Sequence, residues 1–273
     1  MQVLPIVTQQ VLDNFIVWTQ TIEVHNSSLF QSTATKTQDQ LESLLALIPL
    51  NVWPNTTIVA AVRDTSAATK SLSSIPVGKG SKVIIVKLDA TIDSDPAAAV
   101  QELKTKHNIT KIDILLSNAG LLDTIAPVLA TTPETVRRHY EVNTIGPLTL
   151  IQAFMPILLA SPSPRFLVIT SSIGSIADME KLPVPFFAYG ISKAATNYLV
   201  RKIAFESPKI VSAAFNSGWV QTEMGTTAAL GVGMTEAPMT LETSVEGMVN
   251  LIDGASIEKT GTFTAVSGEP TPW

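Results

Sequence analysis

Tyr189 and Lys193 are the residues whose types and spacing most clearly suggest chemistry. Side chains four residues apart share one face of a helix, so the Lys193 ammonium would lie beside the Tyr189 phenol. A free phenol has a pKa of about 10 and is a poor acid–base catalyst at neutral pH. A nearby cation favours the phenolate, so we expect Lys193 to lower the pKa of Tyr189 and to make it a tuned proton donor.

Two serines, Ser171 and Ser172, follow a predicted strand at 166–170 and precede this pair. Ser172 would lie at the carboxyl edge of the sheet, where open α/β sheets bind ligands, and could hold a carbonyl oxygen against Tyr189. A Tyr and a Lys four residues apart also occur by chance on helices, where their role is structural. The order of strand, serines, loop and Tyr/Lys helix favours the catalytic interpretation.

Short β-branched runs alternate with longer helical segments from residue 57 onward, which is typical of a parallel sheet with crossover helices. Asp95 and Thr132 each precede a proline and are predicted N-caps. We expect an α/β fold in a single domain. The predicted strands are 57–62, 82–88, 112–117, 166–170, 210–216 and 262–266, and the predicted helices are 66–73, 96–107, 133–159, 187–206 and 240–253.

The composition excludes several classes of function. A net charge of −5 without a basic cluster argues against a nucleic-acid partner. The longest apolar runs, 44–50 and 145–160, are too short or too interrupted to span a membrane. A secretory signal begins with a positively charged region, but no Lys or Arg precedes Lys36 in this chain. The chain also contains no cysteine. We therefore expect a cytoplasmic protein.

The chain has three histidines, His25, His107 and His139, in separate contexts and without the spacing of metal ligands. We expect surface or capping roles for them and no metal site.

Further residues extend the pattern around Tyr189. A predicted strand ends in Ser117-Asn118-Ala119-Gly120, and Asn143 lies in the helix that follows. With these residues, the chain resembles the short-chain dehydrogenase/reductase superfamily from about residue 54 to the C-terminus. The resemblance implies a Rossmann-like, doubly wound parallel sheet in 54–273, and it implies a catalytic set made of Asn143, Ser172, Tyr189 and Lys193. Asn143 would anchor a water that links Lys193 to solvent.

The same resemblance implies where a nicotinamide cofactor would bind. Lys193 would hold the nicotinamide ribose beside Tyr189, and Arg63 could pair with a 2′-phosphate and so favour NADP(H) over NAD(H). Arg63 could equally be an ordinary solvated charge. The cofactor-binding residues that the resemblance implies are Arg63, Asp89, Asn118, Ala119, Gly120, Tyr189, Lys193, Val220 and Thr222.

Short segments resemble fungal ketoreductases of the norsolorinic acid reductase type, among them the context of Tyr189 and the final Pro-Trp. The resemblance implies a small-molecule ketone or alcohol as substrate, such as an aromatic polyketide. It also allows a homodimer or homotetramer that pairs through helices 133–159 and 187–206. The segment 222–238 is predicted to be a lid. Met179, Pro185, Phe186 and Phe187 could wall an apolar pocket or simply pack a loop.

The N-terminal segment 1–53 departs from the family. Members begin with a strand and a Thr-Gly-x-x-x-Gly-x-Gly turn, but no glycine precedes Gly78 in this chain. The first strand and the Gly-rich loop are therefore missing or replaced. Residues 21–24, followed by a Ser/Thr-rich loop and a helix at 41–48, are one replacement. The other explanation is an N-terminal sequence foreign to the family, through a changed exon or a wrong start.

Two functions follow from this contrast. The first is an NADPH-dependent ketoreductase in which Tyr189 donates the proton. The second is a non-redox or catalytically silent relative whose cofactor binding is weakened.

Overall fold

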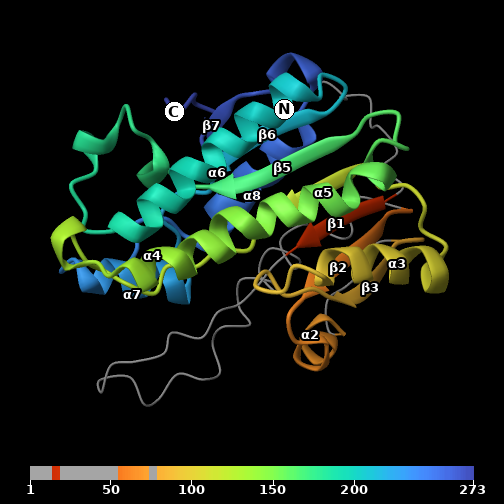
Figure 1. Cartoon of the computed structure of the whole chain (residues 1–273), viewed down its shortest axis with the longest axis horizontal. Helices are drawn as coiled ribbons and strands as arrows, with labels where there is room; N and C mark the ends of the chain where they lie inside the picture. Colours follow the sequence, from red (N-terminus) through yellow and green to blue (C-terminus); the bar gives the residue numbers. More distant parts are fainter. Residues whose placement is uncertain (1–13, 19–54, 74–78) are drawn as a thin grey trace, which may run out of the picture.

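The computed structural model describes residues 14–18, 55–73 and 79–273. The described strands form one seven-stranded sheet in the order β3-β2-β1-β4-β5-β6-β7 (Figure 1). Every neighbouring pair in it is parallel. The strands are β1 Asn14–Trp18, β2 Thr57–Val62, β3 Lys82–Lys87, β4 Ile114–Ser117, β5 Arg165–Thr170, β6 Val211–Asn216 and β7 Phe263–Ala265.

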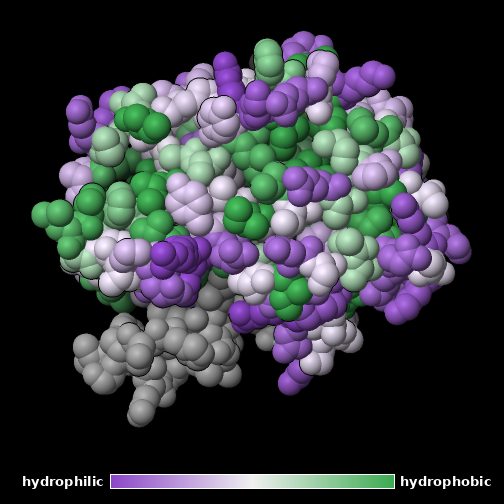
Figure 2. Space-filling view, viewed as in Figure 1, coloured by the Kyte–Doolittle hydropathy of each residue, from purple (hydrophilic) through white to green (hydrophobic). Residues whose placement is uncertain are grey.

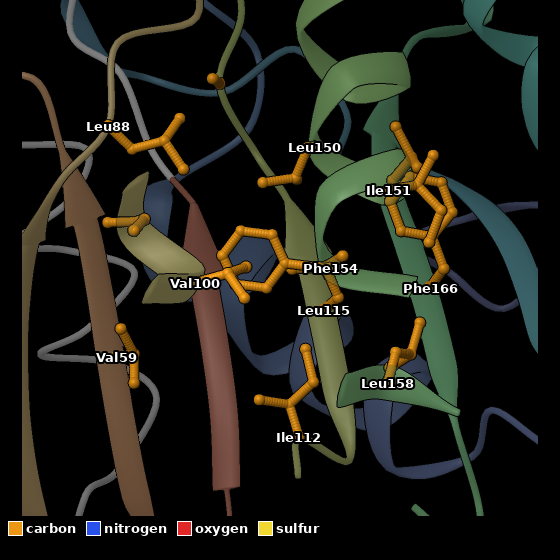
Figure 3. Packing of buried hydrophobic residues seen from close by; sticks show 14 of the residues in the cluster. Val59, Leu88, Val100, Ile112, Leu115, Leu150, Ile151, Phe154, Leu158 and Phe166 are labelled. Atoms are coloured by element: carbon orange, nitrogen blue, oxygen red, sulfur yellow. The ribbon is translucent and has the colours of Figure 1, made fainter. Parts of the chain in front are cut away.

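Helices cover both faces of the sheet. One apolar cluster joins it to α3, α5 and α6, and a second joins it to α2 and α8. Figure 3 shows Phe154 of α5 and Val100 of α3 meeting over the sheet beside Leu115 of β4. The α/β fold with a parallel sheet is confirmed. The helices are α2 Thr65–Leu72, α3 Asp95–His107, α4 Pro133–Tyr140, α5 Gly146–Leu158, α6 Phe187–Glu206, α7 Glu223–Gly231 and α8 Leu241–Asp253.

A strand occupies the central place of the sheet that the sequence analysis left open. β1 pairs on one side with β2, Asn14 opposite Thr57, and on the other with β4, Phe15 opposite Ile114. The alternative of a sheet without its central strand is therefore wrong. β-branched and aromatic residues in 15–17 suit such a position. The proposed replacement strand at 21–24 and the helix at 41–48 lie outside the described residues.

The predicted helix 133–159 is divided into α4 and α5 by a π-helical segment, Glu141–Ile145, in which Gly146 N–H donates to the Glu141 carbonyl. Pro147 provides a reason, because it has no N–H to donate to the carbonyl of Asn143 four residues earlier. π-segments within α-helices are frequent at functional sites. Here the segment carries Asn143.

One local prediction needs correction. Asp95 does not cap α3; its carboxylate instead accepts hydrogen bonds from Lys87 Nζ at 2.8 Å and from Asp89 N–H at 2.9 Å. The segment 222–238 contains the helix α7, whose N-cap is Thr222, and its role as a lid stays a prediction. Thr132 is the N-cap of α4, as predicted, and its side chain accepts from Thr135 N–H.

Candidate active site

A cavity of about 270 Å³ lies at the carboxyl ends of β4, β5 and β6. Its lining combines polar groups, among them Asn118, Ser171 and Tyr189, with apolar side chains such as Phe186 and Trp219. The parallel strands bring residues that are distant in sequence to this one edge of the sheet. Concave, mostly apolar sites with a few convergent polar groups are typical of small-molecule binding.

Tyr189 and Lys193 both line this cavity from α6. Lys193 is buried, with 3% of its surface exposed, and its Nζ donates a hydrogen bond of 3.0 Å to the Ile169 carbonyl at the end of β5. The same Nζ lies 5.7 Å from the centre of the Tyr189 ring. The predicted pairing of ammonium and phenol on one helix face is therefore present.

The protonation properties of the pair differ from the sequence-based expectation. Burial lowers the pKa of Lys193 to about 8. Burial raises the pKa of Tyr189 to about 12, and a hydrogen bond with Ser171 only partly opposes this shift. The expected lowering of the Tyr189 pKa by Lys193 is wrong for this structure, because loss of hydration outweighs the other effects on the phenol. The phenol is held protonated, as a proton donor must be.

Of the two serines, Ser171 is the one whose hydroxyl opposes the rise in the pKa of Tyr189. Ser171 is the first residue after β5 and caps a short 3-10 turn, Ser172–Gly174, by accepting from Ile173 N–H at 3.2 Å. Ser172 lies within that turn and also lines the cavity. Both serines line the cavity, and the catalytic role expected for Ser172 stays a prediction.

Gly174 allows this turn to lie against α6. A Cβ atom at position 174 would stand 2.7 Å from the Lys193 carbonyl carbon and 2.8 Å from Ala194 N. Real side chains do not tolerate such contacts with backbone, so the close approach requires glycine. The turn thereby holds Ser171 next to the helix that carries Tyr189.

Asn143 is fully buried, and its side-chain amide holds the loop that follows β4. Its Nδ2 donates to the Leu121 carbonyl at 2.9 Å and to Ser192 Oγ at 2.9 Å. Its Oδ1 accepts from Leu121 N–H at 2.7 Å. The main-chain carbonyl of Asn143 accepts a hydrogen bond from Thr196 Oγ1. The structure thus shows Asn143 as a link between α6 and the cavity wall, and its predicted role as the anchor of a water stays a prediction.

The residues expected to bind a cofactor lie along the same edge of the sheet. Asn118, Gly120, Val220 and Thr222 line the cavity, and Ala119 is buried beside them. The hydroxyl of Thr222 accepts from Gly225 N–H at 3.1 Å in capping α7.

Arg63 and Asp89 follow β2 and β3 and are not among the described residues that line the cavity. Burial alone would raise the pKa of Asp89, but it is lowered overall by hydrogen bonds from Thr91 and by the positive charges of Lys87 and Arg63. Arg63 and Asp89 are therefore close enough to interact electrostatically.

Trp219 is a cavity residue to which the sequence analysis gave no role. Its indole N–H donates to the Gly225 carbonyl at 2.7 Å, and its ring meets Phe186 edge to face with centroids 5.9 Å apart. Among the four residues predicted to wall the pocket, only Phe186 belongs to the lining, together with the unpredicted Leu182 and Val184. Met179 is 63% exposed instead.

His139 is completely buried, so its predicted surface or capping role is wrong. Its Nδ1 lies 2.8 Å from the Thr135 carbonyl, and its Nε2 lies 3.6 Å from an Asp123 carboxylate oxygen. Burial lowers the pKa of His139, although Thr135 and Asp123 act in the opposite direction. No cluster of three or more metal-binding side chains occurs in residues 14–18, 55–73 and 79–273. Within the same ranges, no helix is both long and apolar enough to cross a membrane.

The fold and the cluster of Tyr189, Lys193 and Ser171 place the chain in the class of oxidoreductases, and comparison with known proteins identifies the family. A model of the short chain dehydrogenases matches residues 54–231. A norsolorinic acid ketoreductase of Dothistroma septosporum is 39% identical over 225 residues, which are 81% of this chain and 84% of that protein. Another, of Aspergillus parasiticus, is 35% identical over 224 residues, 81% of this chain and 83% of the relative.

Among solved structures, the NADPH-bound carbonyl reductase from chicken fatty liver superposes with a TM-score of 0.76 at 25% identity. The superposition covers 97% of this chain and 100% of the reductase. The chain belongs to the short chain dehydrogenase family and is an oxidoreductase related to norsolorinic acid ketoreductases and carbonyl reductases.

Proposed function

We propose that this chain is an NADPH-dependent ketoreductase that converts a ketone into an alcohol. The observation that carries the proposal is the meeting of Ser171, Tyr189 and Lys193 in one cavity, with Lys193 Nζ 5.7 Å from the centre of the Tyr189 ring. The names of the ketoreductase relatives support a ketone on an aromatic polyketide as the substrate.

The space beside Lys193 fits a nicotinamide cofactor. A Cβ atom at Gly120 would lie 3.6 Å from both Lys193 Nζ and Asn143 Oδ1, so glycine leaves room next to the cation. Asn118, Gly120, Val220, Thr222 and Lys193 would hold the cofactor there. When bound, the cofactor supplies the hydride.

The chain's own residues would handle the carbonyl oxygen. Ser171 donates a hydrogen bond to that oxygen and orients it toward Tyr189. Tyr189 then transfers its phenolic proton to the oxygen as the alcohol forms. A cation at Lys193, 5.7 Å from the ring, stabilises the phenolate left behind. The apolar side chains of Phe186 and Trp219 limit access of water to the reacting carbonyl.

One observation favours the second function, a relative with weakened cofactor binding. No glycine precedes Gly78, so the backbone cannot approach a pyrophosphate through a Gly-rich turn. Titration of the protein with NADPH, followed by the cofactor's fluorescence, separates the two functions. We expect saturable binding and consumption of NADPH on addition of an aryl ketone. Absence of saturation at high micromolar NADPH would favour the silent relative.

Substitution of Tyr189 tests the chemical step itself. Tyr189→Phe keeps the ring and removes the proton, so kcat should fall by about 10²- to 10⁴-fold while NADPH still binds. An unchanged kcat would assign the proton donor elsewhere.

We also propose that the chain forms a homodimer or homotetramer through the outer faces of α5 and α6. Tyr198 of α6, with 70% of its surface exposed, supports an interface there. Light scattering coupled to size-exclusion chromatography measures the mass, and a monomer at micromolar concentration would contradict this proposal.

A further inference from the structure

The loop 175–186 forms one wall of the cavity, through Leu182, Val184 and Phe186. Much of this loop is bonded only to itself: the N–H groups of Lys181, Leu182, Val184 and Phe186 all donate to carbonyls within 178–184. Its outer side carries Ile176 and Met179, which are 74% and 63% exposed. Figure 2 shows apolar side chains reaching the surface at the left edge of the molecule, where Figure 1 places this loop, α4 and α7.

Main-chain hydrogen bonds connect the loop to other elements at its ends. At the far end, Phe187 N–H donates to the Ala126 carbonyl at 3.4 Å. At the near end, Ala177 N–H donates to the main-chain oxygen of Trp273 at 3.1 Å. The second bond joins residues that are far apart in sequence, so the position of the loop depends on the position of Trp273.

Trp273 is itself held by side-chain contacts. Its ring lies 5.4 Å from the ring of Phe263, which is buried in β7. The guanidinium of Arg201, on α6, lies 5.6 Å from the centre of the Trp273 ring, and it donates to the Gly261 carbonyl at 2.6 Å. A large aromatic side chain in contact with both a buried ring and a cation is a rigid anchor.

We propose that Trp273 is a positioning residue for the loop 175–186 and thereby sets the shape of the substrate side of the cavity. The aromatic contact fixes Trp273, the main-chain oxygen of Trp273 fixes Ala177, and Ala177 fixes the start of the segment that presents Leu182, Val184 and Phe186. This gives the final Pro-Trp of the sequence a function in substrate binding. The effect on substrate rests on the proposed reductase activity, whereas the effect on the loop does not.

Tryptic cleavage after Lys181 reports the freedom of the loop without any reference to catalysis. Lys181 is exposed within the loop. Trp273→Ala removes the anchor, so the cleavage rate at this site should rise about five- to tenfold. Trp273→Phe keeps an aromatic ring against Phe263 and Arg201 and should restore a rate near that of the unchanged protein. If circular dichroism shows that Trp273→Ala does not fold, Trp273→Leu is used in its place, because the leucine side chain fills part of the space that the indole occupied.

Phe205→Ala is the matched control. Phe205 lies on α6, as Arg201 does, and like Trp273 it has a cation near its ring, since Lys202 Nζ is 5.4 Å from the ring centre. However, Phe205 is 81% exposed and anchors no loop. It should leave cleavage after Lys181 unchanged. Equal acceleration by Trp273→Ala and Phe205→Ala, or no acceleration by Trp273→Ala, would overturn the proposal.

Steady-state kinetics form the second readout. Trp273→Ala should raise KM for the ketone about five- to tenfold and leave the dissociation constant of NADPH unchanged, because the loop contributes to the substrate side of the cavity. A change confined to NADPH binding would overturn the inference. If the protein without any substitution reduced no ketone, the proposed function would be refuted. The rates of tryptic cleavage after Lys181 would still decide the role of Trp273.

Discussion

The hydroxyl of Thr196 donates a hydrogen bond of 2.5 Å to the main-chain carbonyl of Asn143. In a regular α-helix this carbonyl would accept from the N–H of residue 147, but Pro147 has none. The π-helical segment therefore presents a carbonyl to the neighbouring helix, and the fully buried Thr196 binds it. The bond ties the helix of Asn143 to the helix of Tyr189 and Lys193.

Thr196→Val keeps the shape of the side chain and removes this hydrogen bond. Removing a buried hydrogen bond to a carbonyl costs about 1–3 kcal/mol, so the free energy of unfolding should fall by that amount. Because α4–α5 would lose register with α6, kcat should fall more than KM rises. Urea unfolding and steady-state kinetics measure both effects, and Thr196→Ser should rescue them. Activity and stability equal to those of the unchanged protein would show that the bond has no positioning role.

Ser171→Ala removes the hydroxyl that opposes the rise in the pKa of Tyr189. If Ser171 orients the substrate carbonyl, kcat/KM for the ketone should fall by about 10²- to 10³-fold. Ser172→Ala alters the next residue, whose hydroxyl has no such effect on Tyr189, and the loss of activity should be much smaller. The two variants differ by one position, so a larger loss in Ser172→Ala would return the role to Ser172.

Much of this fold and site could be predicted from the sequence. The strands from residue 57 onward are short runs rich in β-branched residues, and Tyr189 and Lys193 share a helix face because they are four residues apart. The proposed preference for Ser171 over Ser172 could not come from the sequence, since it depends on where the chain leaves β5 and on the close approach of Gly174 to α6. The π-helical segment Glu141–Ile145, which divides the predicted helix 133–159, could have been predicted from Pro147. β1 is five residues long, and its assignment comes from pairing with β2 and β4 rather than from local pattern.

The burial of Lys193 predicts a pH-dependent stability. Its pKa is about 8 in the folded protein and 10.5 ordinarily, so between these values the unfolded chain binds more protons and stability rises with pH. Below pH 8 the full cost of the buried charge is present. Lys193→Met removes this cost and should raise the free energy of unfolding at pH 7 by about 1–3 kcal/mol, with activity lost.

The gain from Lys193→Met should shrink as the pH approaches 10. Urea unfolding midpoints of both proteins at pH 7 and pH 9.5 measure the difference. A variant that is less stable at pH 7 would show that the hydrogen bond from Lys193 to the Ile169 carbonyl outweighs the cost of burying the charge.

Arg63 tests the preference for NADPH. Its neighbour Asp64 is committed to capping α2, where its carboxylate accepts from Ser66 N–H and Ala67 N–H, both at 3.0 Å. Because the Asp64 carboxylate is used in this cap, Arg63 is the charged residue after β2 that we expect to contact a cofactor. If it pairs with a 2′-phosphate, Arg63→Ala should raise KM for NADPH about tenfold and leave KM for NADH unchanged. Arg63→Lys should be intermediate, because an ammonium cannot make the two parallel bonds of a guanidinium.

Lys70→Ala is the control for Arg63→Ala, since Lys70 is an exposed cation in the last turn of α2. It should change neither KM, because an exposed charge away from the binding site is screened by salt. The ratio of kcat/KM values for NADPH and NADH, measured for all four proteins, isolates the phosphate from general effects on activity. An equal loss with both cofactors in Arg63→Ala would make Arg63 a solvated charge and leave the choice of cofactor to other residues.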